Sequence, residues 1–238
     1  MKNKNIKPYS ERFLEIDAAR GASVISMVLY HSYVIPQYPY AQQPLREVAI
    51  IIASSFIFLS GLSIKIAYER GYRFPKFLIR SIKIGICALI ITIATYLYVP
   101  TQYVIFGILH FISVASLLIY PLLKRGILHR GVLALAILII FILTPNKAIG
   151  NIFTIPIGFY PKSFHSLDYF PIIPWITVML LGTIFSDIIY PQGERKYKIK
   201  LKESFITKIL VKLGRKSLWI YMGHIPLIYC VTLLIRSL

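Results

Sequence analysis

The sequence predicts an all-α polytopic membrane protein of about seven transmembrane helices, with its N-terminus in the cytoplasm and its C-terminus outside. Hydrophobic residues make up 57% of the 238 residues and charged residues 15%, whereas soluble globular chains hold about 45–50% and about 25%. The mean hydropathy is +0.68. The basic residues behind the net charge of +18 stand between long apolar runs, as in multi-span membrane proteins. A soluble enzyme, a disordered chain and a nucleic-acid-binding domain therefore fit the sequence poorly.

Seven apolar segments account for the expected spans, because a bilayer core of roughly 30 Å takes about 20 helical residues. They lie at about residues 17–36, 47–66, 80–99, 102–123, 127–145, 171–190 and 214–236. The stretch 84–123 carries no charge and suits two spans, with Pro100 at the turn between them. The fifth segment is the weakest, since its charge-free core, 131–145, is short for the bilayer.

The positions of the basic residues set the orientation. With these spans, all but four of the 27 Lys and Arg residues fall on the side of the N-terminus. The four on the other side are Arg46, Lys147, Lys162 and Arg236. Cytoplasmic connections carry the excess of positive charge, so the N-terminus is expected in the cytoplasm. We therefore expect a multi-pass protein of the cell membrane, with residues 1–238 as a single transmembrane domain.

Two connections have unusual compositions. The outer segment 146–170 is rich in Pro, Gly and aromatic residues, so we expect it to dip back towards the membrane under a cover of protein. The segment 191–213 is interpreted as a basic, partly amphipathic cytoplasmic linker, a topology signal on anionic lipid. Cys87 and Cys230 lie inside apolar runs without metal-ligand spacing, which predicts buried apolar side chains and no metal site.

Three histidines fall inside the expected spans. His31 and His110 lie in the outer halves of the first and fourth spans, and His224 lies near the middle of the seventh. An ionisable residue at membrane depth is a candidate functional residue, and three imidazoles at similar depth can converge on one cavity. Taken singly, such a residue more often hydrogen-bonds one helix to another.

The first span carries a polar face. Asp17, Arg20 and His31 project from one side of a helix, because the eleven residues from Arg20 to His31 are close to three turns. The imidazole lies about 16 Å beyond the guanidinium. Small residues around Arg20, Gly21 among them, permit close helix packing. The simpler interpretation of Asp17 and Arg20 is an ion pair at the membrane edge.

Acidic residues border the sixth span. Asp168 precedes the span at the outer surface, where it can orient an imidazole such as His31 or remain an exposed loop carboxylate. Asp187 lies at the cytoplasmic end of the span, where a basic partner is expected. Trp175, near the start of the span, fits an interfacial anchor.

Five segments together resemble a known family. They read RFLEIDAARGASVISMVLYH (12–31), FIFLSGLSI (56–64), FGILHFISVASLL (106–118), DYFPIIPWITVMLLG (168–182) and LGRKSLWIYMGHIPL (213–227). In this order, over nearly the whole chain, they resemble the prokaryotic branch of the heparan-alpha-glucosaminide N-acetyltransferase catalytic domain. The spacing of Arg20 and His31 also resembles the first span of the acyltransferase type 3 family.

The resemblance implies transfer of an acetyl group from cytoplasmic acetyl-CoA to a sugar across the membrane. His31 is then the catalytic imidazole at the outer end of the acyl path, and Arg20 belongs to the CoA side. His110, Asp168, Trp175 and His224 match family positions that line the cavity. Asp168 is counted with His31 as catalytic, because it can orient the imidazole, and Asp17, His110, Trp175 and His224 are counted as cavity-lining support. Lysosomal members carry a functional histidine in the first outer connection, but residues 32–45 have none. His31 therefore takes that role here, or the chemistry differs.

The residues suit this chemistry. Attack of an amine or hydroxyl on a thioester needs a base of near-neutral pKa, which imidazole supplies. The phosphates of CoA need cations, and candidates on the cytoplasmic side are Arg20, Lys65, Arg80 and Lys83. An acetyl-imidazole intermediate and direct transfer both remain open.

Two other functions compete with a membrane-embedded acyltransferase. A proton-coupled transporter or flippase can use intramembrane histidines as relays, but the sequence lacks a central intramembrane carboxylate and repeat symmetry. A structural subunit would use the histidines only for contacts between helices. The expected partners of the acyltransferase are acetyl-CoA, as co-substrate, and a glycan or lipid-linked sugar acceptor. A homodimer is left open, and no nucleic acid is expected.

Overall fold

The computed structural model describes residues 12–37, 46–197, 201 and 204–236. Within these residues every regular element is a helix, which confirms the all-α class. The chain divides into two compact units, and each is described by itself. Unit 1 comprises residues 1–56 and 198–238, and unit 2 comprises residues 57–197.

Unit 1 contains the first and last helices of the chain. Its helices are α1 (Leu14–Val34) with the 3₁₀ turn η1 (Ile35–Gln37), the beginning of α2 (Arg46–Glu69), α7 (Phe205–Arg215) and α8 (Ser217–Arg236). Unit 2 continues α2 and adds α3 (Phe74–Tyr98), α4 (Ile108–Leu118), α5 (Ile127–Leu143) and α6 (Ile172–Ile189). Three 3₁₀ turns join them, namely η2 (Tyr120–Leu122), η3 (Ile152–Thr154) and η4 (Pro191–Gly193).

A helix occupies each of the seven expected spans, yet the helices differ in length and composition. Among the described residues, four helices are long and apolar enough to cross a membrane: α2, α3, α6 and α8. The apolar helices α4 and α5 are shorter. The chain is thus described as a multi-pass membrane protein, while the count of seven spans and the orientation of the termini stay predictions.

The fourth expected span, 102–123, is not one continuous helix. Residues 102–106 are extended beside 166–170, where Leu167 N donates to Gln102 O at 2.8 Å and Phe170 N to Phe106 O at 2.9 Å. This pairing uses backbone groups that a helix would need, so α4 begins only at Ile108. The difference from the expectation arises from hydrogen bonds between distant segments, which hydropathy does not record.

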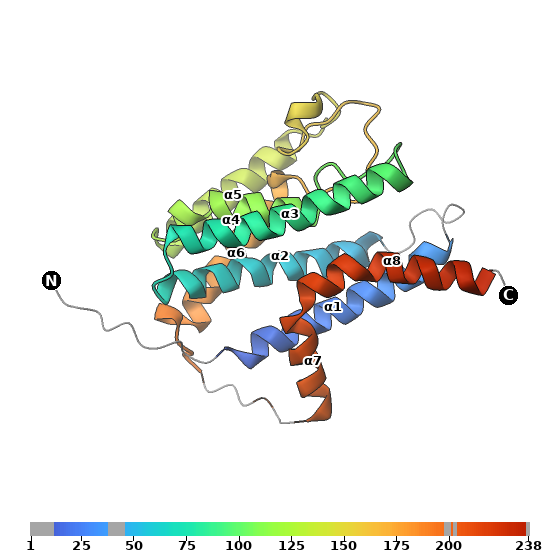
Figure 1. The fold of residues 1–238 in the computed structure, drawn as a ribbon. Helices are drawn as coiled ribbons and strands as arrows, with labels where there is room; N and C mark the ends of the chain where they lie inside the picture. Colours follow the sequence, from blue (N-terminus) through green and yellow to red (C-terminus); the bar gives the residue numbers. More distant parts are fainter. Residues whose placement is uncertain (1–11, 38–45, 198–200, 202–203, 237–238) are drawn as a thin grey trace. The chain divides into compact units, whose positions relative to one another are not determined.

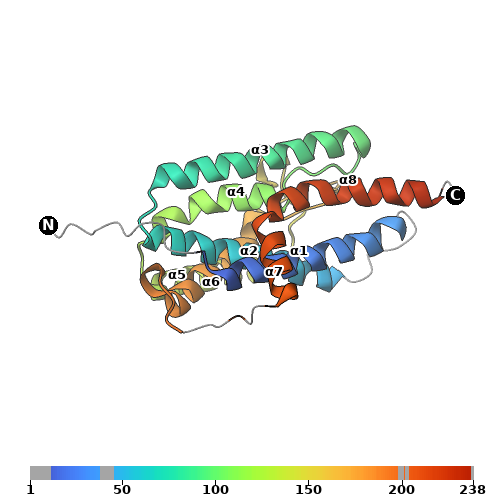
Figure 2. The same cartoon turned by 60° about the horizontal axis from the view of Figure 1, so that its bottom comes forward.

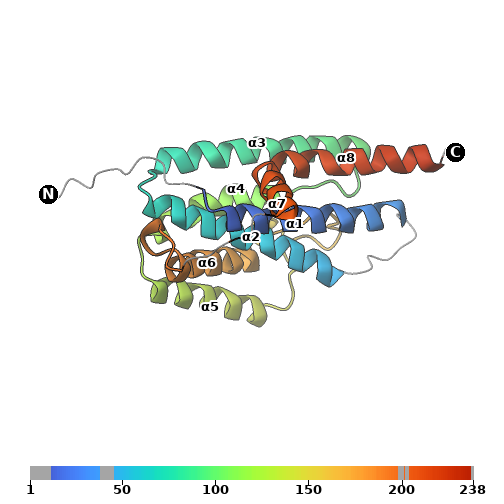
Figure 3. The same ribbon diagram turned by 90° about the horizontal axis from the view of Figure 1, so that it is seen from below.

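The C-terminal part of the expected 191–213 linker folds as the helix α7. Ser204 caps it, since its Oγ accepts a hydrogen bond from Thr207 N at 3.1 Å, a typical N-cap arrangement. Figure 1 shows α7 running across the direction of α1 and α8, and Figure 3 views α7 nearly along its axis. Unit 1 therefore holds a short transverse helix between longer ones.

Glycines set the closest helix contacts in unit 1. A Cβ on Gly21 would clash with the carbonyl of Leu210, and a Cβ on Gly214 would clash with the carbonyl of Asp17. The backbones of α1 and α7 therefore touch, as small residues allow. The close packing expected around Arg20 is present at Gly21, and α7 is its partner.

Unit 2 repeats this kind of contact between α2 and α6. A Cβ on Gly61 would clash with the carbonyl of Met179, and one on Gly182 would clash with the carbonyl of Phe58. The helix α3 lies beside α4, and α5 lies beside α6 (Figures 2 and 3). Gly182 itself is buried, and both α2 and α6 are long and apolar enough to cross a membrane.

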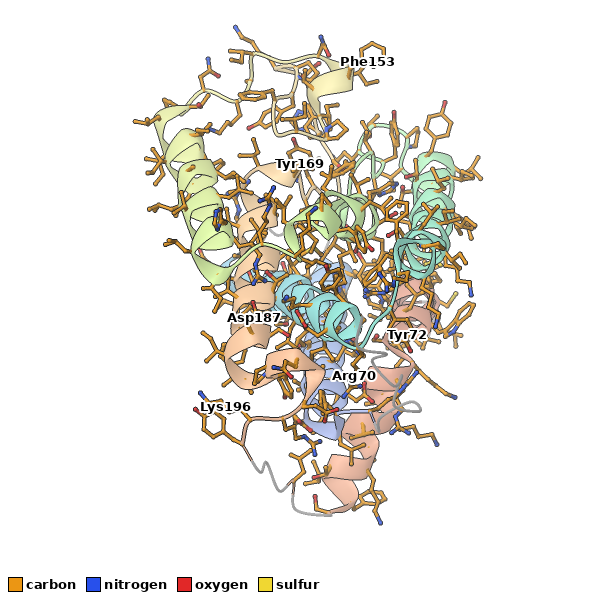
Figure 4. The ribbon with its side chains drawn as sticks, turned by 90° about the vertical axis from the view of Figure 1, so that its left-hand side faces the viewer. Arg70, Tyr72, Phe153, Tyr169, Asp187 and Lys196 are labelled. Carbon is orange, nitrogen blue, oxygen red and sulfur yellow. The ribbon has the colours of Figure 1, made fainter. Side chains whose placement is uncertain are left out.

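The connection from α5 to α6 is held together by hydrogen bonds between its own residues. Gly150 N donates to Tyr160 O at 3.2 Å, and Ile172 N donates to Pro156 O at 2.8 Å. Phe153 points outward and Tyr169 lies within the connection (Figure 4), where the Tyr169 hydroxyl donates to Ile155 O at 2.8 Å. Burial raises the pKa of Tyr169, so this phenol stays neutral. Whether 146–170 dips towards a membrane stays a prediction.

A cluster of paired charges lies inside unit 2. The ammonium of Lys65 pairs with Glu69 and with Asp187, the latter at 3.2 Å, and the guanidinium of Arg130 pairs with Asp187. Lys65 and Arg130 are buried, with 4% and 1% of their surface exposed, and Asp187 lies among the helices (Figure 4). Asp187 therefore has two basic partners, Lys65 and Arg130, where the sequence predicts one.

Candidate active site

His31 and His224 meet in unit 1. The structure places Nε2 of His224 at 3.1 Å from Nδ1 of His31, and the two ring centroids are 4.9 Å apart. His31 comes from the last turns of α1, and His224 comes from α8, where it is 4% exposed. Two of the three histidines expected at similar depth are thus hydrogen-bonded to each other.

The backbone around each ring sets its tautomer. Nδ1 of His224 lies 2.7 Å from the carbonyl oxygen of Tyr221, and Nδ1 of His31 lies 3.0 Å from that of Met27. A carbonyl oxygen only accepts hydrogen bonds, so each Nδ1 carries a proton. In the neutral pair, Nε2 of His224 is then the acceptor, and the His31 N–H is shared between it and the Met27 carbonyl.

This arrangement leaves one basic nitrogen. Because Nδ1 of neutral His31 holds the proton, Nε2 of His31 keeps its lone pair. Among the described residues, no hydrogen-bond donor lies on that nitrogen. The ring of Tyr30 packs edge-on against His31, with centroids 5.2 Å apart. Chemically, the pair can take up a proton at Nε2 of His31 while His224 supports the resulting imidazolium through the opposite nitrogen.

The other end of α1 carries a second polar cluster. The carboxylate of Asp17 accepts from Nη1 of Arg20 at 3.3 Å and from Nε of Arg215 at 3.2 Å. The Arg20 pair is the ion pair that the sequence allows, and Arg215 adds a second cation from α7. The two guanidinium groups and the one carboxylate together carry a net positive charge, which favours an anionic group beside them.

His110 and Asp168 lie in unit 2 and hold the start of α4. Gly107 N donates to Nδ1 of His110 at 3.2 Å, and Nε2 of the same ring lies 3.2 Å from Oγ1 of Thr92. Oδ2 of Asp168 accepts from Ile108 N at 3.0 Å, so a carboxylate from a distant segment caps the helix. Within unit 2, both side chains have a structural role, while an orienting role for Asp168 on His31 stays a prediction.

The remaining predicted residues are spread over unit 2. Trp175 is half-buried in the first turn of α6, with its ring 4.7 Å from that of Phe170. Arg80 is half-buried and Lys83 is exposed, both on α3. Lys65 lies in the buried ion-pair cluster, where it also donates to Leu123 O at 2.8 Å. Their part in CoA binding stays a prediction.

Sequence reasoning missed two features of the site. Arg215 was one of many basic residues in a run, and nothing in its spacing connects it to Asp17. The His31–His224 hydrogen bond joins residues separated by 193 positions, which no local periodicity records. The available signal was the shared depth of the two histidines, and it identified the residues but not their bond.

Within each unit, the motif segments contact each other at glycines. The first and fifth segments meet at Gly21 and Gly214, and the second and fourth meet at Gly61 and Gly182. The third meets the fourth where Gly107 leaves room for the Asp168 carboxylate. The motif segments therefore contain the glycines that let helices pack closely in each unit, as well as polar residues of the candidate site.

Comparison with protein families finds a match to the chain. The family model described as "Heparan-alpha-glucosaminide N-acetyltransferase, catalytic" matches residues 12–226. This range includes His31, His224 and the glycine contacts of both units. No curated protein and no solved structure matches the chain significantly.

Proposed function

The chain belongs to the heparan-alpha-glucosaminide N-acetyltransferase catalytic family, which implies a transmembrane acetyltransferase, and we propose that it moves an acetyl group from cytoplasmic acetyl-CoA to an amine or hydroxyl of a sugar on the outer side. The observation that carries the proposal is the His31–His224 pair, in which Nε2 of His31 meets no hydrogen-bond donor from the described residues. The family supplies the reaction class, and the pair supplies a base suited to it.

In the proposed reaction, Nε2 of His31 is the general base. The acceptor nitrogen or oxygen attacks the carbonyl carbon of the thioester, and its proton passes to Nε2 of His31. The carbon–sulfur bond then breaks. The CoA thiolate leaves with the electron pair and takes the proton back from the imidazolium, so the enzyme returns to its starting state. An acetyl-imidazole on the same nitrogen is the alternative order of these events.

His224 is the positioning residue of this scheme. Its Nδ1–H is held by the Tyr221 carbonyl, so its Nε2 faces the His31 N–H as an acceptor. When His31 is protonated, this hydrogen bond becomes charge-assisted and strengthens. The bond also keeps the proton of neutral His31 on Nδ1, which leaves Nε2 available to the substrate.

We place the CoA phosphates near the opposite end of α1. Arg20 and Arg215 gather on Asp17 with a net positive charge, which supports binding of a phosphate. The rise along the helix from Arg20 to His31 is about 16 Å, the same order as an extended pantetheine arm. A nucleotide held at Arg20 can therefore present its thioester near His31. Lys65, Arg80 and Lys83 remain candidate phosphate ligands from unit 2.

Vectorial transfer in proteoliposomes tests the proposal. Protein is reconstituted with a glucosamine or glucose acceptor inside, and acetyl-labelled acetyl-CoA is added outside. We expect labelled sugar inside with wild-type protein, and a loss of about 10²–10⁴-fold with His31→Ala. The matched control is His165→Ala, which removes an exposed imidazole from the connection before α6 and should leave transfer unchanged. Wild-type transfer by the His31 variant would remove it from the reaction.

A further inference from the structure

The helix α7 has an apolar face that α1 does not cover. The side facing α1 contains Val211 and Gly214, both buried. Away from that side, Ile206 is 68% exposed and Phe205 is 79% exposed. At 100° per residue, Ile206, Ile209 and Leu213 form one stripe, roughly 140° around the helix from the side of Val211 and Gly214.

The other exposed side of α7 is basic. Lys208, Lys212 and Arg215 are exposed and lie on the arc opposite Ile206. The chain from 195 to 216 holds nine Lys or Arg residues and a single acidic residue, Glu203. A helix with one apolar stripe, a basic stripe opposite and low overall hydropathy is typical of helices that lie in the plane of a membrane interface.

The place of α7 in unit 1 agrees with such an orientation. α7 ends at Arg215 and α8 begins at Ser217, and α8 is long and apolar enough to cross a membrane. Figures 1 and 3 show α7 running across α8 and across α1. A helix transverse to a membrane span runs parallel to the plane of the membrane. Its contact with Asp17 and Gly21 is at the beginning of α1, the end that the charge distribution assigns to the cytoplasm.

We propose that α7 is an interfacial helix that binds anionic phospholipid headgroups of the cytoplasmic leaflet. The Ile206 stripe enters the boundary of the acyl chains, and Lys208 and Lys212 reach the phosphates with their apolar stems along the lipid. Lipid accounts for both surfaces, since free phosphate would leave the apolar stripe in water. The inference does not depend on acyl transfer.

A depth measurement tests the apolar stripe. Single cysteines at Ile206 and Lys208, in a Cys87→Ser/Cys230→Ser background, are labelled with an environment-sensitive fluorophore and reconstituted in phosphatidylcholine–phosphatidylglycerol nanodiscs. The two positions lie on opposite sides of α7, which makes Lys208→Cys the matched control. We expect nitroxides on lipid acyl chains to quench the Ile206 probe and soluble iodide to quench the Lys208 probe. Quenching of both probes by iodide alone would overturn the proposal. An Ile206 probe that is shielded from both quenchers would mean a protein partner and would also overturn it.

A second measurement tests the headgroup charge. The phosphatidylglycerol-to-phosphatidylcholine ratio of lipid that co-purifies with full-length protein is compared for wild type and Lys208→Gln/Lys212→Gln. Each basic residue near an anionic surface contributes about a five-fold preference, so the double variant should lose most of the enrichment. The control, Lys124→Gln/Arg125→Gln, removes two exposed charges between η2 and α5 and should change the ratio less. An unchanged ratio in the α7 variant, or equal losses in both variants, would contradict a site on α7.

Discussion

Gly21→Ala is expected to separate α7 from α1. A Cβ on Gly21 would lie 2.0 Å from the carbonyl oxygen of Leu210, whereas real Cβ contacts are essentially never below 3.0 Å. The helices must therefore move apart by at least 1.0 Å, the difference between these distances. The opposing contact, Gly214 on the Asp17 carbonyl, lies in the same interface and leaves little room for α7 to roll instead.

The expected cost follows from three contributions. Overpacking of this kind costs about 1–3 kcal/mol. The Asp17–Arg215 pair, now at 3.2 Å with Arg215 45% exposed on its side chain, would be stretched at a cost of up to about 1 kcal/mol. Alanine recovers about 1 kcal/mol through helix propensity. Together these contributions lower the free energy of unfolding by about 0–3 kcal/mol relative to wild type, whereas an alanine that meets no clash should raise it by about 1 kcal/mol.

Denaturant titration in detergent micelles measures this loss. Gly131→Ala is the matched control, because Gly131 is also inside a helix but a Cβ there would meet nothing within 4 Å. The control should be as stable as wild type or more so. If Gly21→Ala and Gly131→Ala have the same free energy of unfolding, the backbones of α1 and α7 are not as close as this prediction requires.

Three further variants test other contacts. His224→Phe removes one of the two acceptors for the His31 N–H. The net loss of about 1 kcal/mol should lower the rate of acetyl transfer about five-fold. A loss of rate as large as that of His31→Ala would contradict a positioning role. Asp168→Ala leaves the first amide of α4 without its cap and should cost about 0.5–2 kcal/mol of stability, while Asp168→Asn keeps an acceptor. Thermal melts that rank the Asn variant with the Ala variant would refute the capping role. Lys65→Met removes the ammonium from Glu69 and Asp187, while Asp187 keeps the guanidinium of Arg130. It should cost about 3 kcal/mol, the low end for a broken buried pair, because Asp187 keeps a cation and the two carboxylates stay 27% and 20% exposed. The exposed Lys83→Met should cost little, and equal unfolding energies for the two lysine variants would contradict the cluster.

The apolar runs were sufficient to predict the helical class and the approximate place of each long helix. Hydropathy is a local property, and a membrane helix satisfies its backbone within the segment. The expectation of a helix was wrong at 102–107, because there the carbonyls of Gln102 and Phe106 accept hydrogen bonds from Leu167 and Phe170 instead of from the next helical turn. It also missed α7, whose Ser204 cap was hidden in a run of basic residues.

The candidate site was predictable as a set of residues and not as a set of bonds. His31 and His224 were singled out by their depth, since an ionisable residue inside a span is a candidate functional residue. Their hydrogen bond depends on the packing of α1 with α8, which brings distant segments together. The same limit applies to Arg215, which reaches Asp17 only because Gly21 and Gly214 let α7 approach α1.

Release of free thiol from acetyl-CoA is the most direct test of the central claim, that Nε2 of His31 is the base for acyl transfer. Detergent-purified wild type, His31→Ala and His165→Ala are compared with saturating acetyl-CoA and a glucosamine acceptor, and acetyl-CoA binding is measured in parallel. The account predicts saturable release by wild type and by His165→Ala, and a fall of at least about 10²-fold in His31→Ala with binding retained. Release at the wild-type rate by His31→Ala would contradict it.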